Sequence, residues 1–295
     1  MIKHKSYKYR IYPDAEQIKQ IETNFHCSRF VYNHLLDRKI KAYKRRKESY
    51  SKYDTIKMLP AMKKYFSFLK DADSISLQCS VENLDDAYKN FFKKNARFPC
   101  FKLKKDKNQS FTTKAIQGNI CIKKGFIKLP KLGFVKLNYH RKIEGRILNV
   151  TVSRNSIGKY YVSVCCEVDI KPLDTCENQI GIDLGLTHLL TDNSGNKVKN
   201  HKYLHKYENK LKRAQRQLSR KQKGSNNRNR QRIEVAKLHE KITNCRNDFL
   251  HKVSTDLIRN NQIICIEDLG TKNMLKNHKL AKHISDETTM PLLIY

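Results

Sequence analysis

Two acidic residues on apolar segments are the groups of this sequence best placed to do chemistry. Asp183 lies in the apolar run 180–187 with a glycine two residues away on either side, and Glu267 follows the apolar run 262–266. A carboxylate in a strand buried on both faces carries a desolvation cost, and small neighbours let a ligand approach it. Carboxylate oxygens are the ligands that hard cations such as Mg²⁺ prefer. The pattern predicts a cation site, and it favours metal-dependent phosphodiester chemistry.

Both acids also have a structural explanation. An acidic residue at the end of a strand can cap the turn or helix that follows. Asp268, directly after Glu267, is well placed to do this. We favour the ligand interpretation for Asp183 and Glu267, and the capping interpretation for Asp268.

The segments around the two acids follow the order strand, strand, strand, helices, strand. After the Asp183 strand, the sequence predicts a hairpin at 189–199 and two long helices at about 204–218 and 235–257. This order is that of the first half of a ribonuclease H-like (RuvC-type) nuclease fold, in which the first and fourth strands are parallel neighbours. Such a pairing would bring Asp183 and Glu267 to one site.

The charge balance of the chain indicates a polyanionic partner. The 295 residues include 61 Lys and Arg against 28 Asp and Glu, a net charge of +33, and 39% are hydrophobic. A surplus of this size repels itself in a compact chain, so nucleic acid is the expected partner. No apolar run approaches the roughly 20 residues that span a membrane, and no secretory signal is recognisable. We therefore expect a cytoplasmic protein with no membrane partner.

The first 175 residues predict a small β-barrel that contains a helical insertion. Residues 5–12 alternate like a strand with one basic face, and short strands separated by turn signals recur from about 110 to 170. Apolar spacing between them predicts three helices, at about 16–40, 55–70 and 74–94. The expected domains are a barrel, residues 1–13 with 97–175, and a helical domain, residues 14–96.

Two basic segments are the predicted contacts to nucleic acid. In residues 91–105, cations alternate with Phe, and such rings can stack on bases while cations bind phosphates. The Phe side chains are more simply explained as core, whereas the cations are favoured as contacts. Residues 219–232, which hold no acid, form the predicted tip of the helical hairpin and could instead be unfolded without RNA. The candidate contacts are Lys93, Lys94, Arg97, Lys102, Lys104, Lys105, Arg220, Lys221, Arg228, Arg230 and Arg232.

Five stretches in a fixed order resemble the TnpB (OrfB) proteins of bacterial insertion sequences, which are relatives of the type V CRISPR nucleases. They are Tyr-Lys-Tyr-Arg-Ile-Tyr-Pro at 7–13, Cys-Ser-Arg-Phe-Val-Tyr-Asn at 27–33, Ala-Tyr-Lys-Asn-Phe-Phe at 87–92 with Phe-Pro-Cys-Phe-Lys at 98–102, Gly-Ile-Asp-Leu-Gly at 181–185 and Ile-Glu-Asp-Leu at 266–269. The resemblance covers about residues 5–286. It implies a transposon-encoded RNA-guided DNA endonuclease that carries a guide RNA from its own element and selects double-stranded target DNA by base pairing.

The resemblance also implies roles for parts of this chain. The helical segment 14–96 would be the recognition lobe, the barrel the wedge domain, and residues 176–286 a RuvC-like nuclease domain. Gln78 would be a candidate to read the DNA motif that flanks the target, although a solvent-facing role is equally open. Asp183 and Glu267 would be catalytic ligands of Mg²⁺, and the bacterial nucleoid would be the place of action.

The chain departs from the family pattern near its end. The family continues with a zinc ribbon of paired C-x-x-C motifs and a third catalytic Asp. Here residues 287–295 look foreign to the family, and the nine scattered cysteines form no C-x-x-C pair. We therefore expect a C-terminally truncated nuclease domain, no zinc, and a loss of cleavage. Two alternatives stay open, a protein that binds RNA and DNA without cutting, and a decayed remnant with an unpaired sheet edge.

Overall fold

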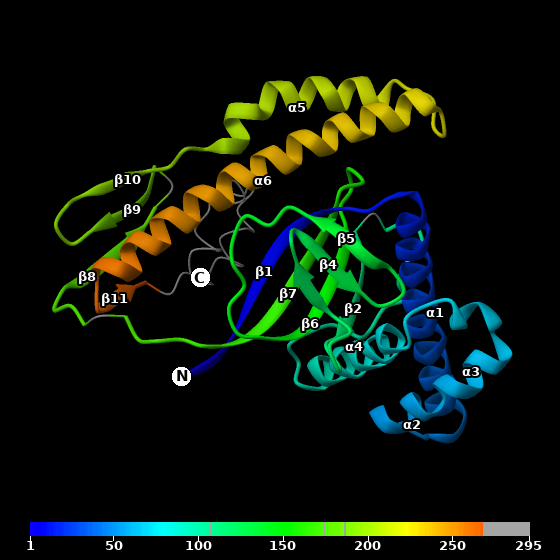
Figure 1. The fold of residues 1–295 in the computed structure, drawn as a ribbon. Coiled ribbons are helices and arrows are strands. Elements are labelled where there is room, and N and C mark those ends of the chain that lie inside the picture. The colour runs from blue at the N-terminus through cyan, green and yellow to red at the C-terminus, as the bar shows by residue number, and fades with distance from the viewer. Residues whose placement is uncertain (107, 174, 186, 268–295) are drawn as a thin grey trace. The chain divides into compact units, whose positions relative to one another are not determined.

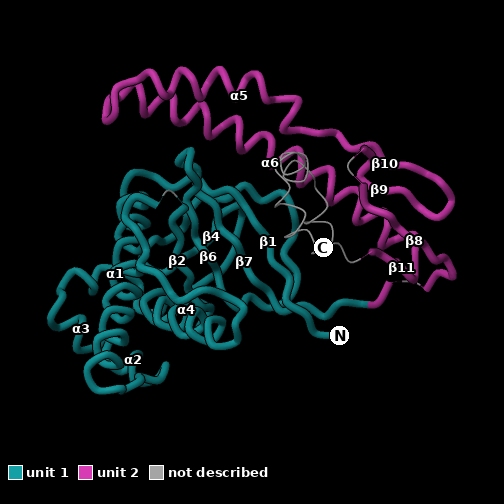
Figure 2. Tube along the Cα trace, turned by 180° about the vertical axis from the view of Figure 1, so that it is seen from behind, with its two compact units in different colours: residues 1–171 teal, residues 172–295 magenta. Residues whose placement is uncertain are grey.

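The computed structural model describes residues 1–267, apart from 107, 174 and 186. The chain divides into two compact units, Met1–Lys171 and the residues from Pro172 onward (Figure 2). The predicted capping by Asp268 and the predicted foreign tail, residues 287–295, lie outside the described residues. Within the described part of the chain, no helix is long and apolar enough to cross a membrane.

The first unit is built on an antiparallel sheet of seven strands (Figure 1). The strands are β1 (Ile2–Tyr12), β2 (Gln109–Lys114), β3 (Cys121–Lys123), β4 (Phe126–Leu129), β5 (Gly133–Leu137), β6 (Arg146–Arg154) and β7 (Tyr160–Asp169). Across the sheet they follow the order β2-β6-β7-β1-β5-β4-β3, so β2 and β3 are the two edges. Because these edges do not pair with each other, the sheet is open, and the closed barrel that the sequence predicted is not confirmed.

Strand β1 lies in the middle of this sheet and connects its two halves. It pairs with β7 along ten residue pairs and with β5 on the other side. Its alternate side chains Tyr7, Tyr9 and Ile11 are buried in the core, as the two-residue period of a strand requires. The strand predicted at 5–12 therefore belongs to the same sheet as strands that follow more than a hundred residues later.

Four helices separate β1 from β2 along the chain. They are α1 (Ala15–Arg46), α2 (Lys52–Lys57), α3 (Leu59–Tyr65) and α4 (Ser74–Phe92), with a 3-10 helix, η1 (Ser67–Lys70), before α4. The single helix predicted at 55–70 is wrong, because three short helical pieces cover this stretch. Pro60 lacks a backbone N–H and is tolerated only in the first turn of a helix, so it lies in the first turn of α3 and α2 does not continue through it.

A buried polar network joins α1, α4 and β2. Asp73, the N-cap of α4, accepts hydrogen bonds from the backbone N–H of Ser76 at 3.1 Å and from the Thr113 hydroxyl of β2 at 2.6 Å. The Asn24 side chain of α1 accepts the backbone N–H of Asp73 at 2.9 Å. Because buried polar groups need partners, this network fixes the start of α4 against the sheet.

The second unit contains a four-stranded sheet and a helical hairpin. Its elements are β8 (Gln179–Leu184), β9 (His188–Asp192), β10 (Lys197–Lys199), α5 (Tyr203–Ser219), α6 (Asn226–Asn260) and β11 (Ile263–Ile266). The strand order is β10-β9-β8-β11, in which β11 is parallel to β8 and the other pairs are antiparallel. The element order predicted for residues 180–266 is therefore present.

The tip of the helical hairpin differs from the expectation. Residues 219–232 were predicted as a connector, but α6 begins at Asn226. The Ser225 hydroxyl accepts the backbone N–H of Arg228 at 3.2 Å and caps the helix, and Gly224 supplies the left-handed turn before it with a φ of 89°. The connector is therefore short, and Arg228, Arg230 and Arg232 lie on the first turns of α6.

Candidate metal centre and nucleic-acid surfaces

The parallel pairing of β8 with β11 sets the positions of the two predicted acids. Its register aligns Ile264 with Ile180 and Ile266 with Ile182. Asp183 and Glu267 are the next residues along their strands, so they occupy neighbouring positions at the same end of the sheet. The predicted parallel relation between these two strands is therefore present.

The two faces of β8 differ, which corrects one expectation. Ile182 and Leu184 are buried and pack in a cluster with Leu250 of α6, whereas Asp183 and Glu267 are exposed. The Asp183 strand was predicted to be buried on both faces, and this is wrong for the described part of the chain, in which α6 packs against Ile182 and Leu184 while Asp183 is exposed. Asp183 therefore needs no cation to compensate for burial.

On the face that carries Asp183, the described residues leave space beside Gly181. A Cβ added at Gly181, two residues before Asp183, would meet nothing nearer than the Asn193 Cβ at 3.9 Å, which is ordinary contact. Thr191 of β9 pairs with Asp183, and Cys265 of β11 pairs with Gly181. A short side chain, Thr191, thus lies beside Asp183 on β9, and on the β11 side Cys265 lies beside Gly181.

Two exposed carboxylates side by side fit a hydrated divalent cation. Mg²⁺ commonly keeps several waters and uses one or two protein carboxylates, so Asp183 and Glu267 have suitable donor chemistry. Among residues 1–267 with their gaps, no group of three or more His, Cys, Asp or Glu is gathered at one place. Among the described residues, Asp183 and Glu267 are therefore joined by no third side chain of these types.

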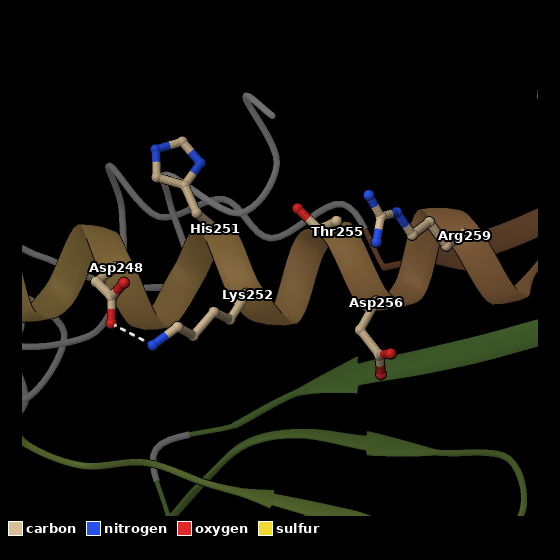
Figure 3. A pocket seen from close by; sticks show the side chains of 6 residues that line it. All are labelled: Asp248, His251, Lys252, Thr255, Asp256 and Arg259. Atoms are coloured by element: carbon tan, nitrogen blue, oxygen red, sulfur yellow. Dashed lines mark hydrogen bonds and ion pairs between the residues drawn. The ribbon is translucent and has the colours of Figure 1, made fainter. Parts of the chain in front are cut away.

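A hollow along α6 does not coincide with this pair. It has a volume of about 370 Å³ and is lined by Asp248, His251, Lys252, Thr255, Asp256 and Arg259 (Figure 3). Asp248 forms an ion pair with Lys252 at 2.8 Å, and Asp256 accepts a hydrogen bond from Asn260 at 2.9 Å. Acids and bases alternate along one helix face here, so the hollow has no excess charge of one sign to select a ligand.

The basic segment after α4 is largely on the surface. Lys93, Lys94, Arg97, Lys104 and Lys105 are exposed, as contacts to a phosphate backbone require. The Phe residues among them were expected to be core, and this is wrong for Phe92, Phe98 and Phe101, which are exposed. For Phe92 the reason lies in α4, whose buried positions stop at Leu84, so its last turns project beyond the packed face, whereas Phe98 and Phe101 follow the end of this helix.

Lys102 is held more firmly than its neighbours. The Asn33 side chain of α1 accepts the backbone N–H of Lys102 at 2.8 Å and donates to its carbonyl oxygen at 2.9 Å. The Lys102 ammonium lies 4.2 Å from the centre of the Tyr32 ring, where desolvation lowers the pKa of the amine. This lysine therefore anchors the segment to α1, a role that the sequence did not reveal.

The cations at the hairpin tip have different environments. Arg220 and Arg230 are exposed, whereas Lys221 lies within 3.5 Å of the Gln231 side-chain oxygen. Arg228 and Arg232 are four residues apart and so lie on one side of α6, with Arg230 on another side. The tip therefore presents cations in several directions.

Gln78 is exposed on α4 between buried Leu77 and Cys79. Its side chain is thus available to a ligand, and this geometry is equally compatible with a solvent-facing role.

Cations of the seven-stranded sheet are stacked on tyrosine rings. Lys8 of β1 lies 5.0 Å from the Tyr161 ring of β7, and Arg10 lies 4.9 Å from the ring of Tyr12. The sequence predicted a basic face for this strand from its alternation. It did not reveal the cross-strand ring under Lys8, because Tyr161 becomes a neighbour only through the pairing of β1 with β7.

Two family models of the OrfB proteins match parts of this chain. Residues 163–278 match the OrfB family of IS605-type elements, described as "Probable transposase", and residues 1–48 match the helix-turn-helix domain of the same proteins. In this structure residues 1–48 form β1 and the single helix α1.

Two curated relatives are named as RNA-guided DNA endonucleases. One, from Streptomyces pristinaespiralis, is 38% identical over 287 residues, which are 96% of this chain and 71% of the relative. The other, InsQ of Escherichia coli K12, is 36% identical over 280 residues, 92% of this chain and 68% of the relative.

A solved structure shares the fold. The chain resembles the Cas12f1 chain from a complex with single-guide RNA and target DNA, with a TM-score of 0.53 and 12% identity. The match covers 99% of this chain and 87% of the other.

Proposed function

This chain belongs to the OrfB (TnpB) family of transposon-encoded RNA-guided DNA endonucleases, and we propose that it binds a guide RNA from its own element and uses it to select double-stranded DNA. The observation that carries this proposal is the 38% identity to an RNA-guided DNA endonuclease across 96% of the chain. The net charge of +33 supports it, because a guide and its target are polyanions.

The basic surfaces of the first unit are suited to binding the phosphate backbone of nucleic acid, which does not depend on base sequence. The exposed cations 93–105 and the Lys8 and Arg10 side chains stacked on rings can contact phosphates and hold a duplex by its backbone. We assign residues 14–96 to recognition of the target and Gln78 to the motif beside it. In this division of labour, base pairing reads the sequence and the protein reads shape and a short motif.

The chemical role is assigned to Asp183 and Glu267. When bound there, Mg²⁺ would polarise the scissile phosphate and help to generate the attacking hydroxide. Asp183 and Glu267 would hold the cation at the end of the β8–β11 pair, and Gly181 would leave space for the DNA backbone beside it. Two-metal cleavage needs more anionic charge than two carboxylates, so a further acidic ligand would be required for full activity.

A second candidate function is guided DNA binding without cleavage. The observation that favours it is that the described residues bring no third ligand to the acidic pair. Both candidates share the guide and the target, and they differ only in the product formed in the presence of Mg²⁺.

The test is to purify the full chain from cells that carry its element and to sequence the RNA bound to it. A discrete transcript from the end of the element is expected, whereas bulk cellular RNA would refute the guided function. The same complex is then incubated with matched duplex DNA and Mg²⁺. Binding with cleavage that disappears in Asp183→Ala supports the nuclease, and binding without cleavage supports the second candidate.

A further inference from the structure

The first unit contains an aromatic cavity to which the roles above assign no ligand. It lies between the second half of α1, the last turns of α4 and the segment that follows α4, and its volume is about 620 Å³. We call it the aromatic pocket. Six rings line it, those of Tyr43, Tyr50, Tyr88, Phe91, Phe92 and Phe98. Cavities of this size and composition are typical of sites for flat organic ligands.

Part of the ring cluster is fixed by its own packing. The Phe98 ring meets the Tyr88 ring edge-on, with centroids 5.6 Å apart and an angle of 88°. Phe98 meets Phe91 in a similar way at 5.3 Å and 84°. Edge-to-face pairs are favourable arrangements of aromatic rings, so these three side chains form a rigid wall.

Two other rings of the pocket remain largely uncovered. Phe92 is 74% exposed and Tyr43 is 57% exposed. Phe92 lies nearly parallel to Tyr88, at 25° and 6.3 Å between centroids, so its orientation is set by the wall. Exposed apolar surface gathered at one place commonly marks a binding site.

The rim of the pocket carries more lysines than acids. Lys39, Lys44 and Lys89 line it, against the two acids Glu48 and Asp85. Lys89 is paired with Asp85 at 2.8 Å, and the Lys39 ammonium lies 5.1 Å from the Tyr88 ring centre. Desolvation at this position lowers the pKa of Lys39. Lys47, Lys93 and Lys94 lie next to these residues in the sequence and extend the positive surface.

We propose that the aromatic pocket binds an unpaired nucleobase of a single-stranded stretch of RNA or DNA, with the neighbouring phosphates on the rim lysines. The inference rests on the proposed nucleic-acid function and adds a site for one flipped-out or unpaired base. A base offers a flat π surface to Phe92 and Tyr43 and carries its own negative charge beside that surface. An apolar peptide would fill the cavity but would bring no negative charge to the excess of lysines over acids at the rim.

The test uses single strands that contain 2-aminopurine, whose fluorescence falls when the base stacks on an aromatic ring. The full chain is titrated with an RNA and a DNA version of the same sequence. We expect strong quenching with at least one of them, and the strand that is quenched at the lower protein concentration identifies the source of the base.

Phe92→Ala and Tyr43→Ala should each weaken binding of that strand by about 5- to 150-fold and reduce the quenching, as loss of one stacked base does. Phe92→Tyr should keep both.

The control is Tyr65→Ala, which removes another exposed ring of the first unit, one that does not line the pocket. Thermal melting checks that each variant is folded, and Phe92 and Tyr43 are exposed enough for truncation to be tolerated. If the quenching persists in both Phe92→Ala and Tyr43→Ala, the base does not bind in the aromatic pocket. This result would leave the proposed guided binding of duplex DNA unaffected. Equal dependence of a fully paired duplex on Phe92 would also overturn the proposed binding of an unpaired base. Failure of the wild-type chain to bind any strand at low salt would refute both the pocket and the proposed function.

Discussion

The two sheets of this molecule differ in how much core supports them. In the first unit, 19 buried residues form the cluster around the seven-stranded sheet, and another 12 form the cluster of the helices. In the described part of the second unit, the buried cluster behind Asp183 has five members. The larger core underlies surfaces that carry exposed cations and rings, and the smaller one underlies the acidic pair. We infer that the cationic surfaces of the first unit are held rigidly, whereas the candidate metal centre has few buried side chains behind it among the described residues.

The largest expected effect is the loss of cleavage in Asp183→Ala, which should leave RNA binding nearly unchanged. Asp183→Ala should lower any metal-dependent cleavage by about 1,000-fold or more, because a metal ion contributes several kcal/mol to the transition state. Affinity for the guide RNA should change less than about twofold, since the cationic surfaces of the first unit are untouched. Cleavage rates and filter binding measure the two quantities.

Metal binding provides a measurement that does not depend on activity. Calorimetric titration with Mn²⁺ should show weaker binding, by about tenfold or more, in Asp183→Ala and in Glu267→Gln, because each removes one anionic ligand. Asp248→Asn on α6 is the matched control and should bind as the wild type does. Unchanged Mn²⁺ affinity in both site variants would show that these acids do not form the centre.

The same truncation in each unit tests the difference in core size. Leu250→Ala and Leu35→Ala both remove a side chain with no exposed surface, and each should cost about 2–5 kcal/mol. The loss should remove the cooperative transition of the second unit, whose core is small, and only lower the urea midpoint of the first. Urea unfolding followed by circular dichroism, with hydrogen exchange to assign the units, gives both values. Equal shifts of the two transitions would contradict the comparison.

Removing a helix cap should lower the free energy of unfolding by less than removing a core leucine. Asp73 is buried and accepts hydrogen bonds from α4 and β2, so Asp73→Ala should destabilise the first unit by about 2–4 kcal/mol. Ser225 caps α6 at its exposed tip, and Ser225→Ala should cost about 1 kcal/mol in the second unit. Thermal melting of the two variants measures the contrast. If both caps cost the same, the buried network around Asp73 contributes nothing beyond local capping.

The alternation of residues in the Asp183 strand already indicates that only one of its faces is buried. Ile180, Ile182 and Leu184 alternate with Gly181 and Asp183, which is the pattern of a strand with one buried face. The same run is apolar almost throughout, with Asp183 as its one carboxylate, and a nearly continuous apolar run predicts burial on both faces. The parallel neighbour β11 could be predicted, since the element order suffices for it. The exposure of Asp183 could not be settled without knowing which face α6 covers.

In the first unit, local patterns predicted the elements but not what covers them. The predicted strand at 5–12 and the predicted strands between about 110 and 170 correspond to β1 and to β2 through β7, because alternation and turn signals are local. The exposure of Phe92 depends on how far the packed face of α4 extends, and this is decided by other parts of the fold. The place of Lys102 over Tyr32 depends in the same way on a contact between residues 70 positions apart. Such features require the tertiary structure.

The smallest expected effect is on the pH dependence of stability in the first unit, through the buried hydroxyl of Tyr9. The Tyr9 hydroxyl donates to the Arg141 carbonyl oxygen at 2.6 Å, and burial raises the pKa of Tyr9 to about 12 from 10.0. Because the folded pKa lies above the unfolded one, the stabilising contribution is complete below pH 10 and is lost as the pH rises from 10 to about 12. Tyr9→Phe should cost about 1 kcal/mol at pH 7 through the lost hydrogen bond. It should also flatten the fall in stability of the first unit between pH 10 and 12, which urea titrations at several pH values measure. An alkaline fall of equal size in Tyr9→Phe would assign it to other groups, such as the lysines.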